Sequence, residues 1–193
     1  MTEPSLAITK GAVALDNPNA AVTANPYGFT APGSSGARFS GTINSTRLAS
    51  SPIKGSASKF DAGDRITFAT VMENLGSGLN GAFNVRIKDL LPAGFVIPAG
   101  GINLSVTDGA GTPLAVTNFG GGTGLFDRGI EVVDAGGTGS MAAYDPSSGK
   151  NVLVVTYDLQ ADAAVTPGES ITNIASLTNY SASAGGPTSS PGP

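Results

Sequence analysis

The chain has 193 residues, with 10 Lys or Arg against 14 Asp or Glu, so its net charge at pH 7 is −4, and it contains no Cys, His or Trp. These absences exclude disulfides, Cys/His zinc sites, c-type haem attachment and Ser-His or Cys-His nucleophilic pairs. A mildly acidic chain with few cations is not typical of a protein that binds nucleic acid or an anionic membrane. No apolar run approaches the ~20 residues of a membrane-spanning helix, so we expect no membrane insertion in this segment.

Charged residues are sparse, and small residues take their place. Charged residues make up 12% of the chain, against about 25% in a typical soluble domain. Hydrophobic residues reach 40%, which is enough for a core in a chain of this length. Such a composition suits an extracellular bacterial β-domain, and an intracellular β-domain is the alternative.

Apolar residues alternate with polar ones along several short segments, and no long segment has the 3.6-residue period of a helix. The run from Val152 to Leu159 is almost continuously apolar, which predicts a central strand buried on both faces. Frequent turn sequences separate the segments, so we expect an all-β sandwich. The expected strands are 6–10, 66–72, 83–89, 102–106, 152–159 and 171–177, with shorter ones at 37–43, 113–117 and 129–133.

We interpret residues 1–180 as a single domain. Residues 11–60, rich in Ala, Pro, Ser and Asn, form a long first connection, expected to be partly strand and partly packed loop. Residues 181–193 (SASAGGPTSSPGP) have the composition of a linker, which we expect to lead to a neighbouring domain of the same protein.

Three polar residues fall on strand faces that are otherwise apolar. Lys10 has the parity of Leu6 and Ile8. Asp89 follows Phe83, Val85 and Ile87 at intervals of two, and Asn173 alternates in step with Ile171, Ala175 and Leu177. All three side chains are therefore predicted to point inward, where a lone Lys or Asp costs several kcal/mol unless it finds a partner.

Three short motifs occur in a characteristic order. They are Gly63-Asp64-Arg65-Ile66-Thr67-Phe68, Asp89-Leu90-Leu91-Pro92-Ala93-Gly94 and, near the end, Asn173-Ile174-Ala175. In this order they resemble the DUF11 repeats of bacterial surface proteins and the isopeptide-forming D2-type domains of fimbrial proteins. The resemblance covers about residues 5–10 and 60–180, and the stretch 11–60 is longer than the family's usual first connection.

The resemblance implies an immunoglobulin-like β-sandwich that serves as a stalk module. In isopeptide-forming members, a Lys on the first strand bonds to an Asn on the last strand, and an acidic residue on a middle strand assists. Carried over, the crosslink joins Lys10 to Asn173, and Asp89 assists as the catalytic acid. A Lys amine attacks only when it is neutral, which burial favours. A protonated buried carboxyl could donate a hydrogen bond to the Asn carbonyl oxygen and then shuttle a proton to the leaving ammonia.

Each of these residues also has a simpler interpretation. Lys10 could be an edge-strand lysine that discourages aggregation, Asp89 could cap the turn before Pro92, and Asn173 could bond a neighbouring backbone group. Asp64 is the alternative assisting acid, because it shares parity with Ile66. Oxygen ligands for calcium exist at Asp16-Asn17 and Asp61/Asp64, but without EF-hand spacing. We therefore expect neither a metal nor a cofactor.

The sequence thus predicts a non-enzymatic stalk module of a bacterial cell-surface or fimbria-like adhesin, located outside the cell and self-crosslinked. The alternative is a ligand-binding adhesin domain that contacts a glycan or protein of a host or matrix through residues 11–60 or the loops of 108–150. A hydrolase is a third reading, disfavoured by the missing His and the lack of a carboxylate pair.

Overall fold

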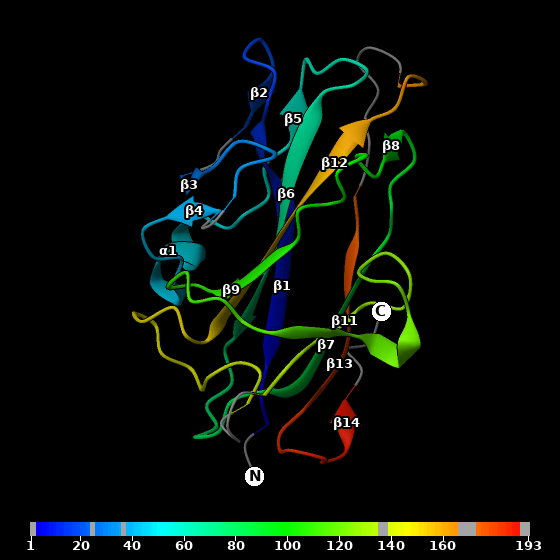
Figure 1. Ribbon diagram of the computed structural model, residues 1–193. Coiled ribbons are helices and arrows are strands. Elements are labelled where there is room, and N and C mark those ends of the chain that lie inside the picture. Colours follow the sequence, from blue (N-terminus) through cyan, green and yellow to red (C-terminus); the bar gives the residue numbers. More distant parts are fainter. Residues whose placement is uncertain (1–2, 24–25, 36–37, 135–138, 166–172, 190–193) are drawn as a thin grey trace.

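Two antiparallel β-sheets pack face to face in the computed structural model, which describes residues 3–23, 26–35, 38–134, 139–165 and 173–189 (Figure 1). The first sheet has the order β1-β6-β12, and β8 and β9 both pair with the free edge of β12. The second sheet has the order β10-β11-β7-β13-β14. The strands of the first sheet are β1 (Leu6–Leu15), β6 (Arg65–Asn74), β8 (Phe95–Val96), β9 (Ser105–Asp108) and β12 (Val152–Ala161); those of the second are β7 (Phe83–Asp89), β10 (Val116–Asn118), β11 (Ile130–Val132), β13 (Ala175–Ser181) and β14 (Thr188–Ser189).

The expected all-β sandwich is confirmed, with 40% strand and 5% helix. Strands β1, β6 and β12 lie in one sheet and β7, β13 and β14 in the other, which is the division of strands found in immunoglobulin-like sandwiches. The main core fills the space between the sheets. It contains the inward side chains of β6 (Ile66, Phe68, Met72), β7 (Val85, Ile87) and β12 (Leu153, Val155, Tyr157, Leu159).

The long connection after β1 forms a separate layer, the covering layer, on the outer face of the first sheet (blue to teal in Figure 1). It contains β2 (Ala21–Val22), β3 (Gly28–Phe29), β4 (Phe39–Ser40), α1 (Ser45–Ser50) and β5 (Ala57–Ser58). Its apolar side chains pack against the outer residues of β6 and β12, and together they form a second core: Val13, Tyr27, Phe39, Ile43, Leu48, Ile53, Ala69, Val71, Val152 and Val154. This layer is the reason why β12 is buried on both faces, as its continuous apolar run predicts.

Two glycines allow this layer to approach β1. The Ala12 N–H donates to the Gly55 carbonyl at 2.8 Å. A Cβ on Gly11 would lie 2.4 Å from the Gly55 backbone nitrogen, and a Cβ on Gly55 would lie 2.6 Å from the Ala12 oxygen. Any larger residue at either position would push the two segments apart.

Several boundaries differ from the prediction. The strand expected at 102–106 is β9, shifted toward the C-terminus, and the strand expected from residue 171 begins, within the described residues, at Ala175 as β13. Helix α1 was not predicted; six residues are too few for a helical period, and Asn44 caps it by accepting from the Arg47 N–H at 3.0 Å. Strand β14 lies inside the stretch of linker composition, where it pairs with the end of β13. In the part of the chain that the structure describes, no helix has the length and apolarity to cross a membrane.

Candidate functional site

Lys10 occupies an inward position in the middle of β1. It lies directly opposite Thr70 in the β1–β6 pairing, between the pairs Ile8–Met72 and Ala12–Phe68. Because alternate residues of a strand point to the same face, Lys10 shares the face that buries Met72 and Phe68 in the main core. The predicted inward orientation of Lys10 is therefore observed.

Asp89 and Asn173 belong to the opposite sheet. Asp89 is the last residue of β7, whose burial alternates strictly along the strand, and it is 1% exposed. Asn173 precedes β13 by two residues, and the β7–β13 pairing sets Ala175 opposite Asp89. The start of β13 thus brings Asn173 close to the end of β7.

The three side chains expected to converge are in direct contact across the sandwich. The Lys10 Nζ donates to both carboxylate oxygens of Asp89 at 2.6 Å and to the Asn173 Oδ1 at 2.6 Å. Lys10 is separated in sequence from Asp89 by 79 positions and from Asn173 by 163 positions. The fold, and not proximity along the sequence, therefore brings the Lys10 amine into contact with the Asn173 amide.

A fourth side chain, which was not predicted from the sequence, completes the cluster. The Tyr157 hydroxyl donates to the Asp89 Oδ2 at 2.7 Å and accepts from the Asn173 Nδ2 at 3.0 Å. Tyr157 lies on β12 and has the parity of Val155 and Leu159, so its ring belongs to the main core. The sequence signal that could have identified Tyr157 is its hydroxyl, a polar group on the inward face of an otherwise apolar strand.

Three aromatic side chains pack around the cluster. The Lys10 Nζ lies 5.3 Å from the centre of the Tyr157 ring and 6.0 Å from that of Phe68. Phe126 packs edge-on against Tyr157 with ring centres 5.3 Å apart, and the neighbouring Leu125 carbonyl accepts from the Asp89 N–H. With the Lys10 side chain only 9% exposed, its charge is largely removed from water.

This environment changes the proton affinities of two groups. Burial lowers the pKa of Lys10 to about 8, although the charge and hydrogen bonds of Asp89 oppose that shift. Burial raises the pKa of Tyr157 well above its ordinary value, and the neighbouring Asp89 charge raises it further. At pH 7 about one tenth of the Lys10 amine is therefore neutral, far more than for an exposed lysine, whereas Tyr157 keeps its proton.

One expected contact differs from the observed one. From the sequence, a protonated Asp89 is expected to donate to the Asn173 carbonyl oxygen, but that oxygen accepts from Lys10. Asp89 instead accepts from Lys10, from the Tyr157 hydroxyl and from the Leu90 N–H. Because three neighbouring groups donate to Asp89, its carboxylate is positioned to accept a proton from the Lys10 amine first and to donate a proton only in a later step.

The alternative acid lies elsewhere. Asp64 precedes β6, where it accepts from the Asn17 side chain and from the Asp61 N–H, both at 2.7 Å. Asp16, from the same loop cluster, accepts from the Arg65 N–H. These carboxylates tie loops together, and among the described residues no group of three or more acidic side chains could hold a metal ion.

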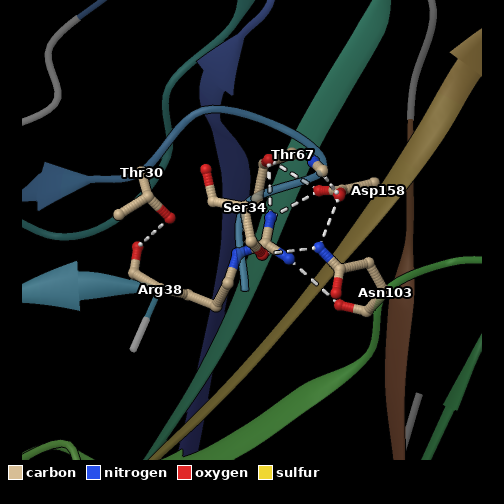
Figure 2. A network of polar contacts seen from close by, with 7 residues as sticks. Thr30, Ser34, Arg38, Thr67, Asn103 and Asp158 are labelled. Carbon is tan, nitrogen blue, oxygen red and sulfur yellow. Dashed lines mark hydrogen bonds and ion pairs between the residues drawn. The ribbon is translucent and has the colours of Figure 1, made fainter. Parts of the chain in front are cut away.

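A second buried ion pair lies on the outer face of the first sheet (Figure 2). The Arg38 guanidinium reaches from the covering layer to Asp158 on β12 and to the Thr67 hydroxyl on β6. Asp158 also accepts from the Thr67 hydroxyl, the Asn103 amide and the Gly33 N–H. Burial raises the pKa of Asp158, but these hydrogen bonds outweigh burial and hold it below its ordinary value. The network includes the Asn103 amide, but a guanidinium does not act as a nucleophile, so this network is a structural tie.

Comparison of the chain with models of protein families, with curated proteins and with solved structures gives no match.

Proposed function

We propose that this protein is a structural stalk module of a bacterial surface or fimbria-like adhesin, stabilised by an isopeptide bond that it forms itself between Lys10 and Asn173. The observation that carries the proposal is the contact of the Lys10 amine with the Asn173 amide, while the buried Asp89 carboxylate accepts from the same amine. The resemblance to DUF11 and D2-type domains supports the same assignment. Bond formation happens once per molecule, so the protein is not a turnover enzyme.

The chemistry of the four side chains supports this assignment over a simple ion pair. A buried Lys–Asp pair needs only two residues, and replacing it by apolar side chains is often neutral or stabilising. Here the Lys10 amine also donates to the Asn173 carbonyl oxygen. The Asn173 amide nitrogen donates to the Tyr157 hydroxyl, which in turn donates to the Asp89 carboxylate. That arrangement supplies a nucleophile, an electrophile and a proton carrier within hydrogen-bond distance.

The position of the bond suits a load-bearing role. Lys10 lies on the first strand of one sheet, and Asn173 lies two residues before β13 of the other. A covalent link between them would carry tension past nearly all of the intervening chain. We place the protein outside the cell, with neighbouring domains of the same polypeptide as its partners.

Single-molecule stretching tests this role. When the protein is pulled from its two ends, the wild type should extend very little, because the link prevents the chain between Lys10 and Asn173, 163 positions apart, from extending. Lys10→Ala should unfold with a long extension. Asn179→Ala is the control, because Asn179 is a buried Asn on β13 whose side chain, within the described residues, donates to the Asn84 carbonyl and not to the cluster. Equal long extensions for wild type and Lys10→Ala would reject the stalk role.

A ligand-binding adhesin domain is the second candidate, and one cavity favours it. This cavity of about 500 Å³ lies between the 97–104 and 118–127 segments and combines apolar residues, including Ile102 and Phe126, with Asn118 and Asp127. The covering layer, in contrast, buries its large apolar side chains against the sheet. A glycan array and a pull-down from host matrix would decide: specific binding abolished by Asp127→Ala favours the adhesin domain, and no binding favours the stalk.

A further inference from the structure

Tyr157 connects the two groups that exchange a proton in the proposed crosslinking reaction. Its hydroxyl lies 2.7 Å from the Asp89 Oδ2 and 3.0 Å from the Asn173 Nδ2, the atom that must leave. Among the described residues, Asp89 makes no hydrogen bond of its own to Asn173, whose carbonyl oxygen is bonded to Lys10 instead. The carboxylate therefore reaches the leaving nitrogen only through the phenol.

We propose that Tyr157 is a catalytic residue that relays the proton from Asp89 to the leaving amide nitrogen of Asn173; this inference rests on the proposed crosslink. Without such a relay the amide nitrogen would have to leave as an amide anion, which is too basic to depart. Donation of the proton is the general-acid step of the reaction.

The atoms balance as follows. The neutral Lys10 amine attacks the Asn173 Cγ, and a bond forms between Nζ and Cγ. One of the two Nζ protons passes to the Asp89 carboxylate, and the other stays on the new amide nitrogen. Asp89 then donates to the Tyr157 oxygen while the Tyr157 hydroxyl gives its own proton to Nδ2. The Cγ–Nδ2 bond breaks, ammonia leaves, and Asp89 and Tyr157 return to their starting states.

The hydrogen-bond chain must reverse during this sequence, and the geometry allows it. At the start Nδ2 donates to Tyr157 and Tyr157 donates to Asp89. Once Cγ is tetrahedral, Nδ2 gains a lone pair and becomes an acceptor, while Asp89 has become a donor. Rotation of one O–H bond then reverses both hydrogen bonds without moving a heavy atom. Since Tyr157 keeps its proton at any ordinary pH, it acts only as a relay and never as the base.

The test compares rates of bond formation in the full-length chain. Protein solubilised from inclusion bodies in denaturant is diluted into buffer, quenched with acid at intervals, and read by intact mass. Tyr157→Phe should form the bond at least about 10²-fold more slowly than wild type, which is the usual contribution of a general acid. Tyr27→Phe is the matched control and should keep the wild-type rate, because its buried hydroxyl bonds the Ser51 carbonyl far from the cluster.

Three outcomes overturn the inference, and they are distinguishable from one another. If the wild type never loses ammonia, the proposed crosslink fails and the relay fails with it. If the wild type crosslinks and Tyr157→Phe matches its rate within twofold, the crosslink stands and the relay is rejected. If circular dichroism shows that Tyr157→Phe does not refold, wild type containing 3-fluorotyrosine replaces it. Fluorination makes the hydroxyl more acidic with little change of shape, so an unchanged rate also rejects the relay.

Discussion

At the residue scale, two opposing effects act on the pKa of Lys10. Its burial disfavours the charged form, and Asp89 favours it, with burial prevailing. In a simple structural ion pair the amine would stay fully charged near neutral pH. The lowered pKa instead provides a reactive amine under ordinary conditions.

The rate of bond formation should therefore depend on pH. Because burial lowers the pKa of Lys10 to about 8, the amine is mostly protonated below that pH and mostly neutral above it. We expect the rate after refolding to rise about tenfold per unit from pH 6 to pH 7 and to level off above about pH 8. Quenched time courses read by intact mass measure this. A rate that stays flat from pH 6 to pH 9 would contradict it, and would show that Lys10 passes its proton to Asp89 within the pair.

The sequence predicts part of this cluster at the residue scale. Strict alternation along 83–89 fixes the inward face of Asp89, and the same argument applies to Lys10 on β1. Tyr157 was not predicted, because a tyrosine inside a continuous apolar run resembles any other core residue. The hydrogen-bond pattern was also inaccessible, since parity gives the direction of a side chain but not the atom that it meets.

The covering layer determines much of the architecture at the scale of elements. The apolar run of β12 predicts burial on both faces, but the sequence does not indicate what covers the outer face. The covering residues are scattered over 27–53 at irregular spacing, because they come from short strands, loops and one turn-and-a-half helix. Contacts between such segments depend on tertiary packing, which local periodicity does not encode.

The ion pair between Arg38 and Asp158 should be a strong tie between this layer and the sheet. Asp158→Ala would leave a guanidinium that is 1% exposed without its carboxylate, and we expect it to lower the free energy of unfolding by about 3–5 kcal/mol. Urea unfolding followed by circular dichroism measures this loss.

Glu131→Ala supplies the control for that measurement. Glu131 pairs with Arg86 at the surface, with both side chains more than a quarter exposed, so its loss should cost no more than about 1 kcal/mol. Equal losses for the two variants would show that the Arg38 network does not fasten the layer.

A covalent link between the sheets would dominate the stability of the whole molecule. In the chain-entropy model, a crosslink that closes a loop of this length stabilises the folded state by about 5 kcal/mol. That is comparable to the whole stability of a marginal domain. A chain without cysteine has no disulfide that could supply such a restraint.

Loss of the link should therefore lower the melting temperature. We expect Asn173→Ala to melt about 10 °C or more below wild type, since 1 kcal/mol corresponds to roughly 2–4 °C in a domain of this size. Asn179→Ala again serves as the control, because it removes a buried amide from β13, the strand that follows Asn173, without touching Lys10. Differential scanning calorimetry compares the three proteins. If Asn173→Ala and Asn179→Ala melted together, the missing side chain and not the missing bond would account for the change.

The most direct test of the central claim is the intact mass of the folded, purified protein. Joining Lys10 to Asn173 releases one ammonia, so the wild type should weigh about 17 Da less than its sequence requires, as amide transfer to an amine demands. Lys10→Ala and Asn173→Ala should each show the full sequence mass, and Asn179→Ala should show the same deficit as wild type. A wild-type protein that is folded by circular dichroism and yet has its full sequence mass would contradict the account.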